Sequence, residues 1–447
     1  TLDVEEPTRW LSVGTVTLTT STDPVGAPIF YRDVPLMPNM GKEGVIKPLS
    51  KNALPLIGWR LRDVAKPESR LLLTGMPSCA NCHSFSLDGK TMGMDVDGPE
   101  GDKGEYMIAP IEEHMVFESD DVITWNAFAD KPKGHKTIGF LSRISPRGGY
   151  AVTTLNESLY VSNFTNYRFL QVFFPTRGIL AWTSKETGEM KALPGADDTE
   201  YVHCNPAWDP SGEHIVFSRA TAFDPHPPGL ELAEYAGDPK EPRIQYDLYR
   251  IPFNGGKGGT PVPIEGASAN GMSNTFPKVS PDGKWIVYTK CENGQLMRPD
   301  GRLWIVPAEG GEAREMNCNT SLMNSWHSFS PNGRWMVFSS KANTPYTQMF
   351  LTHIDEDGND TPAILIPNST AANRAVNLPE FLNARYEALI DIRVPAVNHH
   401  RYFGKGAGLM AEGKFAEAAE QLRKAVEADP EFSRAHVNLA YCLDQLG

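Results

Sequence analysis

The stretch VSPDGKWIVYTK, residues 279–290, joins a tight turn to a strand. In its Ser-Pro-Asp-Gly core the proline presets φ at the second turn position, the aspartate stabilises the turn through local hydrogen bonds, and the glycine accepts the positive φ that follows. The next residues are rich in β-branched and aromatic side chains, which is typical of a strand. The stretch therefore predicts a turn that leads directly into a β-strand.

Four further segments share this pattern of a polar turn followed by a strand, and hairpins with Gly or Asp-Gly at their tips lie between them. A unit of several strands that recurs at intervals of roughly 50 to 70 residues is typical of a β-propeller rather than of a sandwich. The segments are FSLDGKTMGMDV (85–96), ISPRGGYAVTTL (144–155), WDPSGEHIVFSRA (208–220) and FSPNGRWMVFSS (329–340).

These repeats resemble the "SPDG" repeats of TolB-like β-propellers, and the resemblance covers residues 75–370. It implies a mainly β fold with about six blades, of which five are recognisable. We expect residues 1–74, where GTVTLTT and APIFYRDVPL have strand patterns, to contribute a further blade and to close the ring, which would protect exposed sheet edges. Residues 371–400 are predicted to be a linker.

Residues 401–447 have a different pattern, because Phe415, Ala418 and Leu422 recur at helical spacing before Asp-Pro and a second amphipathic helix. This segment resembles the tetratricopeptide repeat, which implies an α-helical surface that docks a protein partner. Stacked repeats need neighbours to bury their apolar faces. We therefore expect either that the natural chain continues beyond residue 447 or that another surface covers the last helix.

The composition limits the classes of partner. A net charge of −13 argues against nucleic acid, which needs a basic binding surface, and favours a redox protein partner with a basic surface. No apolar run approaches the roughly 18 residues of a membrane span. The first residues, TLDVEEPTRW, contain neither an initiating Met nor a signal peptide, so we expect a processed or trimmed amino terminus.

The motif CANCH, from Cys79 through Cys82 to His83, is the strongest chemical signal. C-x-x-C-H supplies two thiols and an adjacent imidazole, the signature of covalent haem attachment. A zinc site would need a second ligand pair, but the next cysteine is Cys204, and a thioredoxin-like redox pair would need a βαβ unit. We predict one covalent haem c, with thioethers at Cys79 and Cys82 and with His83 as proximal ligand; a metal site and a redox pair remain alternatives. We expect free, buried thiols at the other cysteines, which are Cys204, Cys291, Cys318 and Cys442.

Alignment of CHSFSLDG with WHSFSPNG places His83 and His327 at the same position in two blades, so both could approach the axial channel. His327 is therefore the first candidate for the distal iron ligand, and a hydrogen-bonded structural histidine is the alternative. The other candidates are His203, His399, His400 and Met76.

An acidic stretch, DVDGPEGDKGE, follows the haem motif closely. Its Asp95, Asp97 and Asp102 could provide oxygen ligands for calcium, but their spacing departs from the twelve-residue calcium loop. An exposed hairpin is therefore the favoured interpretation.

The combination of CHSFSLDG, DVDG and NSWHSFSPNGRW within a TolB-like propeller resembles a family of exported bacterial propeller proteins that bind c-type haem, some of which carry tetratricopeptide repeats. The resemblance implies a periplasmic or extracellular location and haem attachment through Cys79, Cys82 and His83. We predict a monohaem cytochrome that transfers electrons rather than a catalyst. The alternatives are a scaffold or assembly subunit of an envelope complex in which haem is a covalent staple, and a peroxidase-like or gas-sensing protein with an open distal site.

Overall fold

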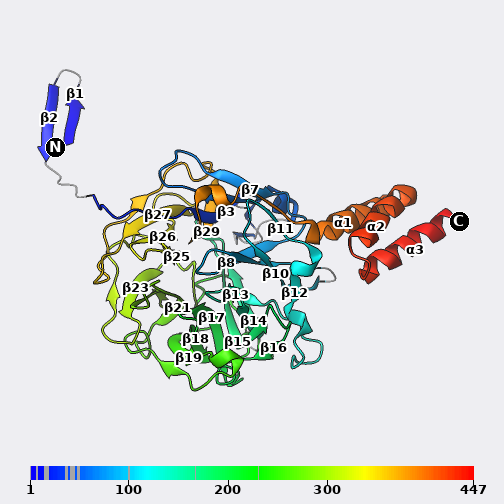
Figure 1. The fold of residues 1–447 in the computed structure, drawn as a ribbon, viewed down its shortest axis with the longest axis horizontal. Coiled ribbons are helices and arrows are strands. Elements are labelled where there is room, and N and C mark those ends of the chain that lie inside the picture. Colours follow the sequence, from blue (N-terminus) through cyan, green and yellow to red (C-terminus); the bar gives the residue numbers. More distant parts are fainter. Residues whose placement is uncertain are drawn as a thin grey trace.

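Six antiparallel blades form a ring in the part of the chain that the structure describes (Figure 1). The structure is a computed structural model that describes residues 2–6, 9–14, 20–35, 39–40, 46–47, 51–98, 101–166, 168–229 and 231–447. Four blades are separate four-stranded sheets, and the other two are joined by a single parallel pair between Gly178 and Val202. The predicted β-propeller is confirmed by this strand order.

Each blade runs outward from an innermost strand next to the ring axis. From the inside outward, one blade consists of β29 (Arg374–Phe381), β3 (Ile29–Pro35), β6 (Gly58–Arg62) and β7 (Arg70–Thr74), and the next consists of β8 (Ala80–Phe85), β9 (Thr91–Val96), β10 (Glu105–Pro110) and β12 (Val122–Thr124). The two blades that share the parallel pair are β13 (Phe140–Ile144), β14 (Tyr150–Asn163), β15 (Gln171–Ser184) and β16 (Met190–Ala192), and then β17 (Tyr201–Trp208), β18 (His214–Thr221), β19 (Asp247–Pro252) and β20 (Val262–Pro263). The last two blades are β21 (Ser273–Val279), β22 (Trp285–Cys291), β23 (Arg302–Pro307) and β24 (Arg314–Glu315), and then β25 (Ser325–Phe329), β26 (Trp335–Ser340), β27 (Gln348–His353) and β28 (Ile364–Leu365).

The repeated turn links the innermost strand of a blade to its second strand. In the turn before β22, Gly283 has a φ of +74°, which few residues other than glycine adopt readily, and Ser280 Oγ accepts a hydrogen bond from the Trp285 N–H at 3.0 Å. The five recognised repeats lead into β9, β14, β18, β22 and β26, which are the second strands of five blades.

The ring is closed by pairing of the two ends of the propeller, because β29 is antiparallel to β3. The segment APIFYRDVPL contains β3, whereas most of GTVTLTT lies outside the described residues. The prediction that residues 371–400 form a linker is wrong: β29 completes a blade, and β30 (Asp391–Arg393) pairs with β11 (His114–Val116). Sequence analysis missed β29 because no Ser-Pro-Asp-Gly turn follows it. Two short hairpins, β1 (Leu2–Glu6) with β2 (Arg9–Gly14) and β4 (Asn39–Met40) with β5 (Ile46–Lys47), complete the strands.

A bulge interrupts the pairing of every innermost strand with its neighbour. Such a bulge inserts an extra residue and redirects the side chains beside it. Residues within or before the bulges line one mouth of the axial channel, and residues after them line the other mouth. In five of these strands a bulge residue has a φ between 52° and 58°; these residues are Leu141, Asn205, Phe276, Trp326 and Leu378.

Three helices follow the propeller and extend from one side of it (Figure 1). They are α1 (Asn398–Ala411), α2 (Phe415–Ala428) and α3 (Ser433–Leu446), and they bury Ala418, Leu422 and Cys442 between them. Arg401 Nη2 in α1 donates a hydrogen bond to the Gly75 carbonyl at 3.1 Å, which ties the helices to the propeller. No helix in the described ranges is both long and apolar enough to span a bilayer.

Candidate functional site

The C-x-x-C-H motif lies on β8, the innermost strand of its blade. Cys79 directly precedes this strand, Cys82 lies in its bulge, and His83 returns to the regular ladder opposite Met94. Both thiols are half-buried and form no disulfide, and Cys79 Sγ lies 3.3 Å from Asn81 Oδ1. The bulge therefore places one thiol beside the axis and leaves the adjacent imidazole in the blade.

His83 is buried in an apolar environment and is only 1% exposed. Its ring centroid lies 4.6 Å from that of Phe30 and 5.7 Å from that of Phe85. Neither ring nitrogen has a hydrogen-bond partner among the residues that the structure describes. Burial lowers the pKa of His83 to about 3, so the imidazole is neutral at physiological pH. A buried polar group without a partner costs stability, and a neutral imidazole with free nitrogens is the form that binds metals.

Cys82 lines a cavity of about 420 Å³ at one mouth of the channel. The wall on that side is largely apolar because the bulges of other blades contribute Leu141, Trp326 and Leu378. Charged groups are added by Arg32, Asp95 and Lys103. The cavity thus combines a thiol, an apolar wall and an ionic edge.

Arg32, in β3, is a functional candidate that sequence analysis missed. Its Nε is buried without a hydrogen-bond partner, and its guanidinium forms no ion pair among the described residues. Burial lowers the pKa of Arg32, and the nearby thiols Cys79 and Cys82 oppose that shift. The only sequence signal is a charged Arg-Asp pair within an apolar strand, which does not reveal what the arginine faces.

Of the three aspartates that the sequence offers for calcium, Asp95 and Asp97 line the Cys82 cavity and Asp102 does not. Asp102 is a structural hydrogen-bond acceptor: its oxygens receive bonds from Thr124 Oγ1 at 2.6 Å, Asn126 Nδ2 at 2.7 Å and the Gly104 N–H at 2.8 Å. Asp95 lies on β9, where burial raises its pKa to about 8, and the Asp97 N–H donates to the Cys79 carbonyl at 2.8 Å. Within the described ranges, no group of three His, Cys, Asp or Glu side chains is arranged to hold a metal ion.

His327 occupies the position in β25 that His83 occupies in β8, three residues before the turn serine. Unlike His83 it lies in the bulge, between Ser325 and Ser328, and its Nε2 lies 2.9 Å from the Val287 carbonyl oxygen. Strand β29 lies between β8 and β25 around the ring, so the two histidines belong to blades that are not adjacent.

The other candidate ligands are spread over the molecule. Met76 is the candidate whose surroundings are closest to those of the haem motif, because it packs in the same hydrophobic core as Ala80 and Met94. His203 Nε2 lies 3.1 Å from the Asp198 carbonyl oxygen in another blade. The rings of His399 and His400 in α1 are tilted by 36° to each other, with centroids 4.1 Å apart. The remaining cysteines are free, buried thiols as predicted; they are Cys204, Cys291, Cys318 and Cys442.

Comparison with known proteins supports the helical assignment. Residues 409–447 match the tetratricopeptide repeat family. No curated protein sequence matches the chain. Similar solved structures include TolB from Acinetobacter baumannii, with 14% identity and a TM-score of 0.45 over 80% of this chain and 66% of that one. A putative TolB from Agrobacterium tumefaciens has 13% identity and a TM-score of 0.43 over 72% of this chain and 97% of that one. Hydrazine synthase from Kuenenia stuttgartiensis has 11% identity and a TM-score of 0.43 over 82% of this chain and 48% of that one. The strand order of the described residues is that of a six-bladed β-propeller, and helices that match the tetratricopeptide repeat follow the propeller in the same chain.

Proposed function

We propose that this protein is a monohaem c-type cytochrome that transfers electrons. Cys79 and Cys82 would form thioethers with the haem, and His83 would be an axial ligand of its iron. The observation that carries the proposal is the buried His83 imidazole, whose two nitrogens lack partners in the described part of the chain, next to a thiol that lines a cavity.

The residues fit a covalent haem by their chemistry. Both thiols are free to react, and the low pKa of His83 leaves a nitrogen lone pair available at neutral pH. A haem bound there would supply a reversible one-electron redox couple. The aromatic rings of Phe30 and Phe85 exclude water from His83, which favours a stable ligand. Only one such motif is present, so a longer electron path would require a partner.

The first experiment is a spectrum of the purified protein, oxidised and reduced, after expression with an export signal and the machinery for haem c maturation. We expect sharp low-spin bands and one haem per chain in a pyridine haemochrome assay. A chain without haem would contradict the proposal and would leave a propeller scaffold with a helical docking arm. A high-spin spectrum with carbon monoxide binding would instead favour an open distal site.

Arg32 is the residue best placed to pair with a haem propionate, because it lines the cavity and has no ion-pair partner among the described residues. Replacing a cation near the haem with a neutral side chain disfavours the reduced state. We expect Arg32→Met to lower the reduction potential by on the order of tens of millivolts. Potentiometry would measure this shift. The control is Arg147→Met, which removes the same charge from an exposed turn and should leave the potential unchanged.

His327 should act as a structural histidine, because its Nε2 is hydrogen-bonded to the Val287 carbonyl. We therefore expect His327→Ala to leave the low-spin spectrum unchanged and to cost about 1–3 kcal/mol of stability, since it leaves a buried acceptor unpaired. His83→Ala is the matched control, because it makes the same change at the equivalent position and should alter the spectrum. A high-spin spectrum of His327→Ala would instead identify it as the distal ligand.

The helices would dock the redox partner. Tetratricopeptide repeats provide surfaces for protein partners, and α3 exposes Val437, Tyr441 and Leu446. The net charge of −13 favours a basic partner through electrostatic attraction. Since haem c is attached outside the cytoplasm, the proposal includes a periplasmic or extracellular location.

A further inference from the structure

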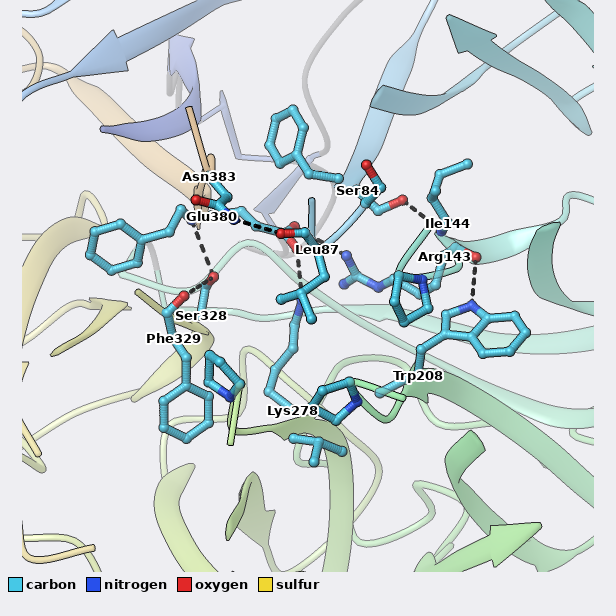
Figure 2. A pocket seen from close by; sticks show the side chains of 18 of the residues that line it. Ser84, Leu87, Arg143, Ile144, Trp208, Lys278, Ser328, Phe329, Glu380 and Asn383 are labelled. Carbon is cyan, nitrogen blue, oxygen red and sulfur yellow. Dashed lines mark hydrogen bonds and ion pairs between the residues drawn. The ribbon is translucent and has the colours of Figure 1, made fainter. Parts of the chain in front are cut away.

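The second mouth of the axial channel, on the other side of the bulges, contains a site that the haem proposal does not use. Each innermost strand contributes a residue that follows its bulge to a cavity of about 140 Å³ (Figure 2). These six residues are Ser84, Arg143, Ala207, Lys278, Ser328 and Glu380. Because they come from all six blades, the cavity lies on the ring axis.

The floor of this cavity carries more positive than negative charge. Arg143 Nη1 lies 3.1 Å from Glu380 Oε2, and Lys278 Nζ lies 2.9 Å from Glu380 Oε1 (Figure 2). The three side chains are 8%, 16% and 16% exposed, so water screens them weakly. One carboxylate therefore balances two cations when Lys278 is protonated, and burial lowers the pKa of Lys278 to about 8. Burial raises the pKa of Glu380, but Lys278 and Arg143 more than offset this and lower it to about 2, so Glu380 stays ionised.

Asp209 also lines the cavity and keeps its negative charge, but it lies on the turn of its blade and forms no ion pair with Arg143 or Lys278 among the described residues. Its Oδ1 accepts the His214 N–H at 3.1 Å, and its Oδ2 accepts the Ser211 hydroxyl at 2.8 Å. Arg143 uses its Nη1 for both Glu380 and the His83 carbonyl, which leaves the other edge of its guanidinium for a further acceptor. Arg143, Lys278 and Glu380 thus leave one surplus positive charge on the floor, and the Asp209 carboxylate lies at the rim.

The rim above the floor is partly apolar, with Asp209 as its charged member. The turns of four blades place Pro146, Pro210, Pro281 and Pro331 around it, and Phe329 stands beside them. An apolar collar above a cationic floor suits a ligand that has one anionic end and an aliphatic body. A planar carboxylate matches the guanidinium fork better than a spherical ion does.

We propose that this mouth binds a carboxylate, either that of a small organic acid or the terminal carboxylate of a polypeptide inserted into the channel. The site does not depend on the haem, because all of its groups belong to the protein. A bound carboxylate would complete the charge balance of Arg143, Lys278 and Glu380.

Isothermal titration calorimetry at low ionic strength tests the proposal with three probes: acetate, N-acetyl-trialanine as the free acid, and the same peptide as its C-terminal amide. We expect the free acid to bind and the amide not to bind. Acetate that binds as tightly as the peptide acid would identify small acids as the source of the carboxylate, whereas a clear advantage for the peptide acid would identify a chain terminus. Equal binding of acid and amide, or no binding of either acid, would overturn the proposal.

Two variants with opposite effects locate the site. Lys278→Met should weaken binding of the peptide acid at least about tenfold, because it removes the surplus charge. Glu380→Gln should strengthen it at least about threefold, because it adds to that surplus. Lys257→Met removes the same charge as Lys278→Met, but from an exposed turn at the edge of its blade, and should change nothing. Thermal melts establish that each variant is folded, and unchanged affinity in either folded channel variant would refute the site.

Discussion

Changing both Cys79 and Cys82 to alanine should abolish covalently bound haem. A thioether needs a thiol on the protein, and these are the two thiols of the motif, both free of disulfides. The purified double variant should show no haem stain on a denaturing gel and no haemochrome absorbance, whereas the parent chain should carry one haem. Each single variant should keep the haem through one remaining bond, with a shifted haemochrome band.

The control removes the same number of thiols from elsewhere in the propeller. Cys291 and Cys318 are buried in other blades, so Cys291→Ala combined with Cys318→Ala should keep a full complement of haem. Covalent haem in the Cys79 and Cys82 double variant would disprove attachment at the motif, even if the protein proved to be a cytochrome.

Changing Asp33 to alanine should lower the free energy of unfolding by about 3–5 kcal/mol, because it leaves two arginines without their buried counter-ion. Asp33 lies on β3, and its side chain is 1% exposed. Its carboxylate accepts bonds from Arg374 Nε at 2.6 Å and from Arg60 Nε at 2.7 Å. Arg374 begins β29, so the interaction ties the two ends of the propeller together. Urea denaturation followed by tryptophan fluorescence would measure the loss.

An exposed ion pair provides the comparison for Asp33. Glu387 Oε1 lies 3.4 Å from Lys66 Nζ, with both side chains largely in solvent. Such pairs contribute about 0–1 kcal/mol, so Glu387→Ala should have a small effect. A loss for Asp33→Ala no larger than that for Glu387→Ala would mean that the buried cluster does not hold the ring closed.

Much of the propeller was predictable because its signals are local. The Ser-Pro-Asp-Gly turn acts within a few residues, and each recognised copy leads into the second strand of a blade. The helices α2 and α3 were predictable from their apolar periodicity, whereas α1 begins within the segment that was predicted to be a linker. Strand β29 was not, because its blade begins without that turn and is completed by β3 from the opposite end of the chain.

The candidate site likewise has a part that was predictable from local sequence and a part that was not. C-x-x-C-H is a local motif, and its position on an innermost strand followed from the turn after it. The equivalence of His83 and His327 was also visible in the alignment, but their different environments were not, because the bulge in β8 lies one residue earlier than the bulge in β25.

The sequence by itself determined the repeated turns, the helical repeat and the residues of the C-x-x-C-H motif, since each depends on neighbours within one turn or strand. Only the tertiary structure decided that Arg32 shares a cavity with Cys82 and that Arg143, Lys278 and Glu380 meet on the axis. The physical reason is ring closure: it brings together side chains that are far apart in the chain, and their mutual burial and charge leave no signal in any local stretch of sequence.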